Sequence, residues 1–483
     1  MCKTAIEICH DGHVSRISNW IHRSLVGRGF PTGLAVLIYT FSYGQNLLLG
    51  NTYFWDDWQN RITKAEFAAK ARLSGFPPTR DILEYDILGN SGVLFRILTF
   101  ACYFIAAVCV HRIIRHGLEL SPTQVNVITL IFLVAPINST RAAMIIMHYS
   151  LSFAIFFGAW ALVISRRVSV QLIALPLFWI SFGTPSLLPF FLLPLGHWIW
   201  INRAKLAKVK AQLSILLLLV TPISYWIVRA LTFGSGVREY YVPRPLGVVR
   251  GGLVVVLAAG IVLYGIVRRK WSLFGTSRPL LAALGFFAVA LGASTYMAGG
   301  HLVDISDWLI SFVPNFSDWD SRHQLLLGLG IAGVVCAALV NPSEPELTKN
   351  RLNSIIAVLG ICCVLNFTFS QEYYLDSLKQ EQVIAAFKEI PELRTVDTIM
   401  IDDQALRFNA RGRMLRSFEW QEMINISLGR EKPIIVEPLR YVDCTEFNPS
   451  AIVQISALNG RLESLLTRDL GIRASVMQIE PCP

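Results

Sequence analysis

The chain has 483 residues, of which 53% are hydrophobic and only 16% are charged, and its mean hydropathy is +0.50. This composition excludes an ordinary soluble domain, in which roughly 25% of residues are charged. The formal net charge of +10 does not indicate a nucleic-acid partner, because the basic residues form short clusters between apolar runs. That pattern is typical of cytoplasmic loops that face anionic membrane lipids.

The first 29 residues are basic and precede the first apolar run, and no small-residue cleavage site follows that run. We therefore expect residues 1–29 to form a cytoplasmic tail rather than a signal peptide. Apolar runs long enough to cross a bilayer as helices then recur as far as residue 371. The predicted spans are 30–49, 92–110, 121–138, 142–164, 168–183, 185–201, 211–231, 248–267, 279–298, 325–340 and 353–371.

These runs predict a polytopic α-helical protein with about eleven spans, in which residues 30–371 form the membrane domain. With a cytoplasmic N-terminus, an odd number of spans places the C-terminus outside, and the basic clusters then fall inside. The same topology puts the loop of about 50–91, the segments 234–247 and 299–324, and everything after residue 371 on the outer face. The inner connections are too short to hold a nucleotide-binding domain.

Residues 372–483 are charged, mixed in pattern and without a further spanning run. They predict a small extracytoplasmic α/β domain. Helices are expected over 372–390 and 452–470, and short strands over 395–401, 432–438 and 474–480.

Only two of the nine cysteines, Cys444 and Cys482, fall in this predicted domain. An oxidising compartment would favour a disulfide between them. A second acidic pair, Asp402–Asp403, follows a predicted strand, and a turn is its simplest explanation.

Three glycines, Gly328, Gly330 and Gly333, spell GLGIAG and formally match the dinucleotide-binding fingerprint. That fingerprint requires a preceding strand and a helix N-terminus aimed at a pyrophosphate. This copy lies inside a predicted membrane helix, so we expect its small residues to let two helices approach closely.

The stretch NTYFWDDWQN (51–60) follows the first apolar run and places two carboxylates between two tryptophans. From Trp58 onward apolar residues recur at helical spacing, which predicts an amphipathic interfacial helix over 57–73. Asp56 or Asp57 would cap that helix, and the tryptophans would anchor it at the membrane interface. Capping needs one carboxylate, so the other is available as a base for an acceptor hydroxyl.

An acidic pair in the first outer loop, an interfacial helix, many further spans and an outer C-terminal domain resemble the GT-C superfamily of membrane glycosyltransferases. The stretch NTYFWDDWQNR (51–61) is most similar to the bacterial glucosyltransferases that modify O-antigen. The resemblance implies a sugar donor linked to polyprenyl phosphate. It also implies that Asp56 or Asp57 acts as base or orients the acceptor, and leaves open which one does so.

A physical argument leads to the same donor, because nucleotide sugars and ATP are absent outside the cell. A transfer on the outer face must therefore use a group that was activated within the membrane. Charge develops on the leaving phosphate as the glycosidic bond breaks, and cations stabilise it. Arginine suits phosphate through its bidentate geometry. The candidate ligands of the donor phosphate are Arg238, Arg244, Arg322 and His323.

Further candidates are less specific. Tyr240, Tyr241 and Trp58 are candidates for contact with the sugar or the acceptor, with anchoring at the membrane interface as the alternative. Arg141 and His148 lie near the outer end of a predicted span, where ionisable groups are costly and often line a cavity. A divalent metal at the acidic pair is left open, since no third ligand is evident.

The predicted function is transfer of a sugar from polyprenyl phosphate to a glycan, lipid or protein outside the cytoplasm, by an inverting displacement in the bacterial inner membrane. An O-antigen polymerase is one alternative, although its arginines would lie in large loops between spans. A lipid or polysaccharide transporter or flippase is another, for which inverted repeats would be expected. A membrane O-acyltransferase is a third, with His148 as its candidate residue.

Overall fold

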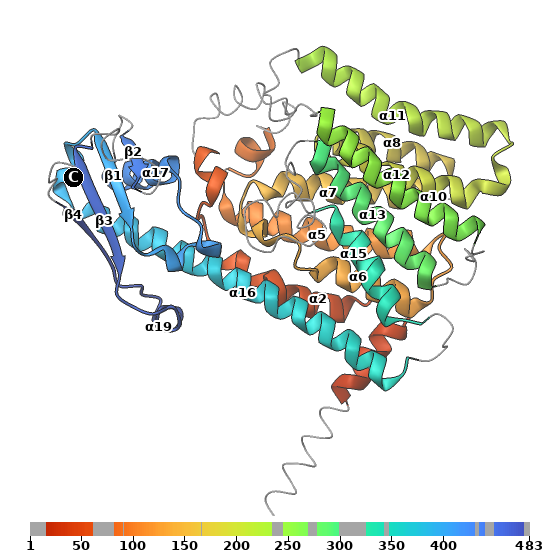
Figure 1. Cartoon of the computed structure of the whole chain (residues 1–483), viewed down its shortest axis with the longest axis horizontal. Coiled ribbons are helices and arrows are strands. Elements are labelled where there is room, and N and C mark those ends of the chain that lie inside the picture. The colour runs from red at the N-terminus through yellow and green to blue at the C-terminus, as the bar shows by residue number, and fades with distance from the viewer. Residues whose placement is uncertain are drawn as a thin grey trace, which may run out of the picture.

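The computed structural model describes residues 16–60, 82–89, 91–165, 167–233, 245–268, 278–298, 325–341, 347–429, 434–439 and 449–477. Most of these residues are helical, and most of the helices gather at one end of the molecule, while α17 (Ser417–Leu428) and α19 (Arg461–Thr467) lie beside the sheet at the other (Figure 1). Six described helices are long and apolar enough to cross a membrane, which indicates a multi-pass membrane protein. They are α5 (Gly92–Arg115), α7 (Ile146–Val163), α11 (Val209–Phe233), α12 (Pro245–Val267), α13 (Arg278–Ala298) and α16 (Lys349–Lys388).

Other apolar runs form shorter helices: α2 (Thr32–Tyr43), α6 (Pro122–Val134), α8 (Val168–Ser181), α9 (Leu187–Phe190), α10 (Leu192–Asn202) and α15 (Leu327–Leu339). Several predicted boundaries differ from the structure. The run 30–49 continues past α2 as a 3-10 helix, Gly44–Leu49. The run 185–201 divides into α9 and α10, in a stretch whose prolines remove backbone donors.

Helix α6 lies at the centre of the helical part, and every residue from Gln124 to Val134 is buried. A helix that is apolar on all sides suits such a position. Phe132 of α6 stacks on Phe153 of α7, with ring centroids 5.7 Å apart. These contacts fix α7, whose N-terminus lies beside the acidic pair.

Helices α13 and α15 pack through glycines. A Cβ atom at Gly330 would lie 2.5 Å from the backbone oxygen of Gly285 and 2.5 Å from the backbone nitrogen of Val289. The glycines of GLGIAG therefore permit close helix packing, as the sequence predicted. They lie inside α15 and do not form a nucleotide-binding turn.

We expect Gly330→Ala to destabilise the protein by about 1–3 kcal/mol, because backbone atoms cannot move away from the added methyl group. The control is Gly260→Ala in α12, where no atom lies within 4 Å of the added Cβ. The control gains up to about 1 kcal/mol in helix propensity. Thermal unfolding in detergent micelles measures both, and a rise in Tm for Gly330→Ala would contradict close packing.

The C-terminal sheet has four strands in the order β2-β1-β3-β4. Strands β1 (Thr398–Asp403), β2 (Ile435–Pro438) and β3 (Ala451–Ala457) are parallel, and β4 (Ile472–Met477) is antiparallel to β3. Strands β1, β2 and β4 overlap the predicted strands 395–401, 432–438 and 474–480. The sheet, the end of α16, and the helices α17 (Ser417–Leu428) and α19 (Arg461–Thr467) are called the C-terminal domain below.

The prediction of a helix over 452–470 is wrong. Residues Ala451–Ala457 form β3, and within the predicted range only α19 is helical. Buried and half-buried side chains alternate along β3, which is the period of a strand with one face on a core. The β-branched residues of IVQI favour that outcome.

Helix α16 joins the two parts of the molecule (Figure 1). The predicted span 353–371 and the predicted helix 372–390 form one continuous helix of 40 residues. No glycine or proline lies between residues 361 and 390, so nothing in this stretch breaks the backbone ladder. Its buried residues beyond the apolar run include the charged Asp376 and Lys379.

Candidate functional site

The acidic pair lies in a 3-10 helix, Trp55–Asn60, and not at the start of an α-helix. Residues 61–73 of the predicted interfacial helix lie outside the described residues. Asp57 is fully buried, and its carboxylate accepts three backbone hydrogen bonds. The donors are the amides of Phe54 at 3.1 Å, Met144 at 2.8 Å and Ile145 at 2.9 Å.

Met144 and Ile145 immediately precede α7, so Asp57 caps a helix that begins far away in the sequence. The negative charge suits the N-terminal dipole of α7 and satisfies amides that have no partner within that helix. Burial raises the pKa of Asp57 to about 6, and the amide hydrogen bonds of Met144 and Ile145 oppose that rise. Because both carboxylate oxygens already accept amide protons, Asp57 is occupied as a structural group.

Asp56 has the opposite environment. Its side chain is half-buried, and among the described residues it forms no hydrogen bond or ion pair. The preceding residue, Trp55, has a φ of 50°, a backbone conformation that is uncommon for residues other than glycine and that occurs often at functional sites. The two neighbouring carboxylates therefore differ in role: one is saturated and the other is available.

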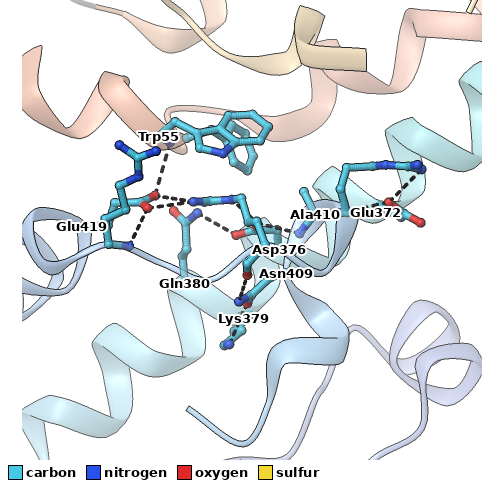
Figure 2. A network of polar contacts seen from close by, with 12 residues as sticks. Trp55, Glu372, Asp376, Lys379, Gln380, Asn409, Ala410 and Glu419 are labelled. Atoms are coloured by element: carbon cyan, nitrogen blue, oxygen red, sulfur yellow. Dashed lines mark hydrogen bonds and ion pairs between the residues drawn. The ribbon is translucent and has the colours of Figure 1, made fainter. Parts of the chain in front are cut away.

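Trp55 is held by the C-terminal domain (Figure 2). Its backbone N–H donates to Oε1 of Glu419 at 3.2 Å, and the guanidinium of Arg413 lies 4.7 Å from the centroid of its ring. Arg413 also donates to both carboxylate oxygens of Glu419, at 2.7 and 2.8 Å. Tyr373 of α16 meets the Trp55 ring edge-on, with centroids 5.5 Å apart. The loop of residues 51–60 that carries the acidic pair, called the acidic loop below, is thus held both by the C-terminal domain and by α16.

The polar network continues into the C-terminal domain. Asp376 lies 3.4 Å from Nε of Arg413, and its other contacts include the amide N–H of Ala410 at 2.8 Å. Lys379 donates to Asp403 at 2.7 Å. The turn predicted at the second acidic pair is present, because Oδ1 of Asp403 accepts the amide N–H of Ala405 at 3.0 Å directly after β1. Asp403 also neutralises the buried Lys379.

The prediction that Trp55 and Trp58 anchor at a membrane interface is wrong. Trp55 is 5% exposed and Trp58 is 2% exposed. Trp58 belongs to the hydrophobic core of the C-terminal domain and contacts the cluster that contains Leu375 and Leu378. Its role as a sugar contact stays a prediction.

His148 lies in the first turn of α7, and its Nε2 contacts the carboxylate of Glu84, a pair that is ionic when the histidine is protonated. Glu84 belongs to the short π-helix Ile82–Ile87 and is 1% exposed. Because Asp57 caps the same end of α7, the acidic loop and this pair meet at one helix N-terminus. The sequence singled out His148 but not Glu84, whose partner lies 64 positions further along the chain.

Arg96 is a structural residue that the sequence analysis missed. It is buried in α5 and donates to the carbonyl groups of Gly50, Thr52 and Ala142. It therefore ties the acidic loop to the segment before α7. The available signal was a charged residue inside a predicted span, which is costly unless it has partners.

Arg141 is buried, and its guanidinium lies 4.1 Å from the ring centroid of Tyr43 and 3.8 Å from that of Tyr103. Nη1 donates to the carbonyl of Leu133 at 3.4 Å. Among the described residues no carboxylate forms an ion pair with Arg141. The cation is stabilised mainly by aromatic faces.

A groove of about 610 Å³ lies between the acidic loop and the C-terminal domain. Tyr53 and Trp58 line it from the loop, and Tyr374 and Glu381 line it from α16. Its volume is typical of small-molecule sites.

The other predicted site residues lie outside the described part of the chain. They are the phosphate candidates Arg238, Arg244, Arg322 and His323, and the aromatic candidates Tyr240 and Tyr241; Cys444 and Cys482 are also outside it. Within the described ranges no group of three or more histidine, cysteine, aspartate or glutamate residues is placed to hold a metal ion.

Comparison with protein-family models, with curated proteins and with solved structures finds no match for this chain.

Proposed function

We propose that this protein is a membrane glycosyltransferase that moves a sugar from polyprenyl phosphate to an acceptor outside the cytoplasm, with Asp56 as the general base. The observation that carries this proposal is the difference between the two aspartates. Asp57 is saturated by three amides, while the half-buried Asp56 beside it has no hydrogen bond or ion pair within the described part of the chain. A fixed loop that presents one free carboxylate suits acid–base chemistry on a hydroxyl group.

The proposed topology has about eleven spans, with the N-terminus in the cytoplasm and the C-terminal domain outside the bacterial inner membrane. Six long apolar helices support a multi-pass arrangement. The contact of Trp55 with Glu419 and Arg413 supports placing the acidic loop and the C-terminal domain on the same side.

In the proposed reaction the acceptor oxygen attacks the anomeric carbon of the donor sugar, and the bond from that carbon to the phosphate oxygen breaks. The proton of the acceptor hydroxyl passes to Asp56, and polyprenyl phosphate leaves with the electron pair. One displacement inverts the anomeric configuration. Arg238, Arg244, Arg322 and His323 are the proposed ligands of the leaving phosphate, because charge develops there.

We expect Asp56→Asn to lower transfer by about 10²–10⁴-fold, the usual contribution of a positioned acid or base. The variant should fold normally, because the Asp56 side chain forms no hydrogen bond or ion pair with the described residues and Asn is nearly the same size. Mass spectrometry of the host's surface glycans measures the hexose increment, and Tm in detergent measures folding. The control is Glu389→Gln, an exposed carboxylate near the end of α16, which should leave transfer unchanged. Full transfer by folded Asp56→Asn would refute the assignment.

The pair His148–Glu84 favours a second candidate, a membrane O-acyltransferase. A histidine oriented by a buried carboxylate is a common general base for transfer to a hydroxyl group. The same mass measurement separates the two functions, because an acyl increment differs in mass from a hexose increment.

A further inference from the structure

The groove beside the acidic loop has a lining that suits a saccharide. Three aromatic residues, Tyr53, Trp58 and Tyr374, line it together with polar side chains. It is also lined by the aliphatic side chains of Leu48, Leu49, Leu378, Ile384 and Ile426. A pyranose ring has an apolar face of C–H groups that packs on aromatic side chains, and a rim of hydroxyl groups that hydrogen-bond. Aromatic residues with a polar end serve both parts of such a ligand.

The charge of the groove is balanced. Among its lining residues Glu381 is the acidic one and Arg468 the basic one, and both are exposed. A site for a lipid phosphate would carry excess positive charge. A balanced pair instead offers a carboxylate acceptor and a guanidinium donor to a neutral, hydroxyl-rich molecule.

Trp58 supplies an independent sign of a ligand. It is 2% exposed, it lines the groove, and its Nε1–H has no hydrogen-bond partner among the residues that the structure describes. Buried donors are nearly always paired in native structures, so an unpaired one calls for an explanation. Solvent does not reach Nε1 in this structure, so a ligand oxygen in the groove would provide the missing acceptor through a small shift of the Trp58 ring.

Two groove residues are close in sequence to the proposed base, although Asp56 itself does not line the groove. Tyr53 and Trp58 stand on either side of Asp56, three residues before it and two after it. Their rings contact each other, with centroids 5.3 Å apart. A ligand held against these two residues lies next to the loop that carries Asp56.

We infer that this groove binds saccharide units of the acceptor, an inference that rests on the proposed function. The volume of about 610 Å³ suits a short oligosaccharide. The C-terminal domain then has a defined task, because α16 and Arg468 supply one wall of the acceptor site. The acceptor class is accordingly a surface glycan rather than a protein or a free lipid.

The test uses two groove variants: Tyr374→Ala removes one aromatic ring, and Glu381→Trp fills the groove. The control is Glu389→Trp, at an exposed position just after the end of α16. The assay uses purified protein in nanodiscs, a polyprenyl-phosphate hexose as donor, and short oligosaccharides released by mild acid from the host's surface polysaccharide. We expect both groove variants to raise the acceptor KM by about tenfold or more, equivalent to about 1.4 kcal/mol of binding. The donor KM and the control should stay unchanged.

Calorimetric binding of the same oligosaccharides to Asp56→Asn, without donor, separates the two proposals. If the Asp56→Asn variant binds the oligosaccharides and the further substitution Glu381→Trp abolishes that binding, the groove is supported. If the wild-type protein then shows no transfer, only the proposed function is refuted. Transfer that proceeds with an unchanged acceptor KM in both groove variants overturns the groove and leaves the proposed function standing. Absence of both binding and transfer overturns both.

Discussion

Replacing Arg413 by alanine is expected to destabilise the C-terminal domain by about 3–5 kcal/mol, the usual cost of removing one partner from a buried ion pair. Glu419 and Asp376, both 0% exposed, would lose the guanidinium that lies between them. Burial already raises the pKa of Glu419 although Arg413 opposes the rise, so the unpaired carboxylate would take up a proton more readily. Thermal unfolding and limited proteolysis measure the loss.

Arg394→Ala is the matched control, because Arg394 is exposed and such changes usually stay within about 0.5 kcal/mol. The double variant Arg413→Met with Glu419→Leu should recover part of the stability, since it leaves neither member of the pair charged. Recovery would remain incomplete because the buried Asp376 still loses the guanidinium of Arg413 and the amide of Trp55 loses its acceptor. A wild-type Tm for Arg413→Ala would show that the network does not stabilise the domain.

The network explains how a domain at the end of the chain bears on a loop near its beginning. Glu419 and Trp55 are 364 positions apart in the sequence and form one hydrogen bond. Loss of Arg413 should therefore increase hydrogen exchange at the amides of Trp55 and Asp57 as well as within the sheet. The acidic loop depends on the C-terminal domain for its geometry.

Hydropathy was sufficient to predict the helical part, because apolar runs of membrane length have few other solutions. It was less informative about boundaries. The continuous helix α16 begins in an apolar run and ends in a charged one. The change in composition near residue 371 was therefore interpreted as the border between two domains, although it lies within one helix. The strand β3 was mistaken for a helix because its two-residue alternation is short and a helix follows it.

The site was predicted only in part. The position of the acidic pair followed from its sequence context, but the roles of its members depend on long-range partners. Nothing near Asp57 in the sequence indicates that it accepts hydrogen bonds from Met144 and Ile145, 87 and 88 positions away. The same holds for Glu84 and Arg413. Charged residues buried in pairs leave a sequence signal only when both partners are already known.

The second large effect is expected at Asp57, where the substitution separates a structural role from a catalytic one. Asp57→Ala leaves three backbone donors, those of Phe54, Met144 and Ile145, without their acceptor. Each unsatisfied buried donor costs about 1–3 kcal/mol. We therefore expect a large fall in Tm, together with faster hydrogen exchange at the start of α7.

Asp57→Asn tests the assignment more sharply, because both carboxylate oxygens accept amide protons. An asparagine keeps one acceptor oxygen and turns an N–H₂ group toward at least one amide N–H, so it should also lower Tm. Asp56→Asn should leave Tm unchanged and lower transfer by about 10²–10⁴-fold. If Asp57→Asn instead kept the wild-type Tm and lost transfer while Asp56→Asn stayed active, the base would be Asp57. Thermal unfolding and transfer measured on the same preparations decide between the two carboxylates, because only Asp57 is expected to stabilise the fold through its hydrogen bonds.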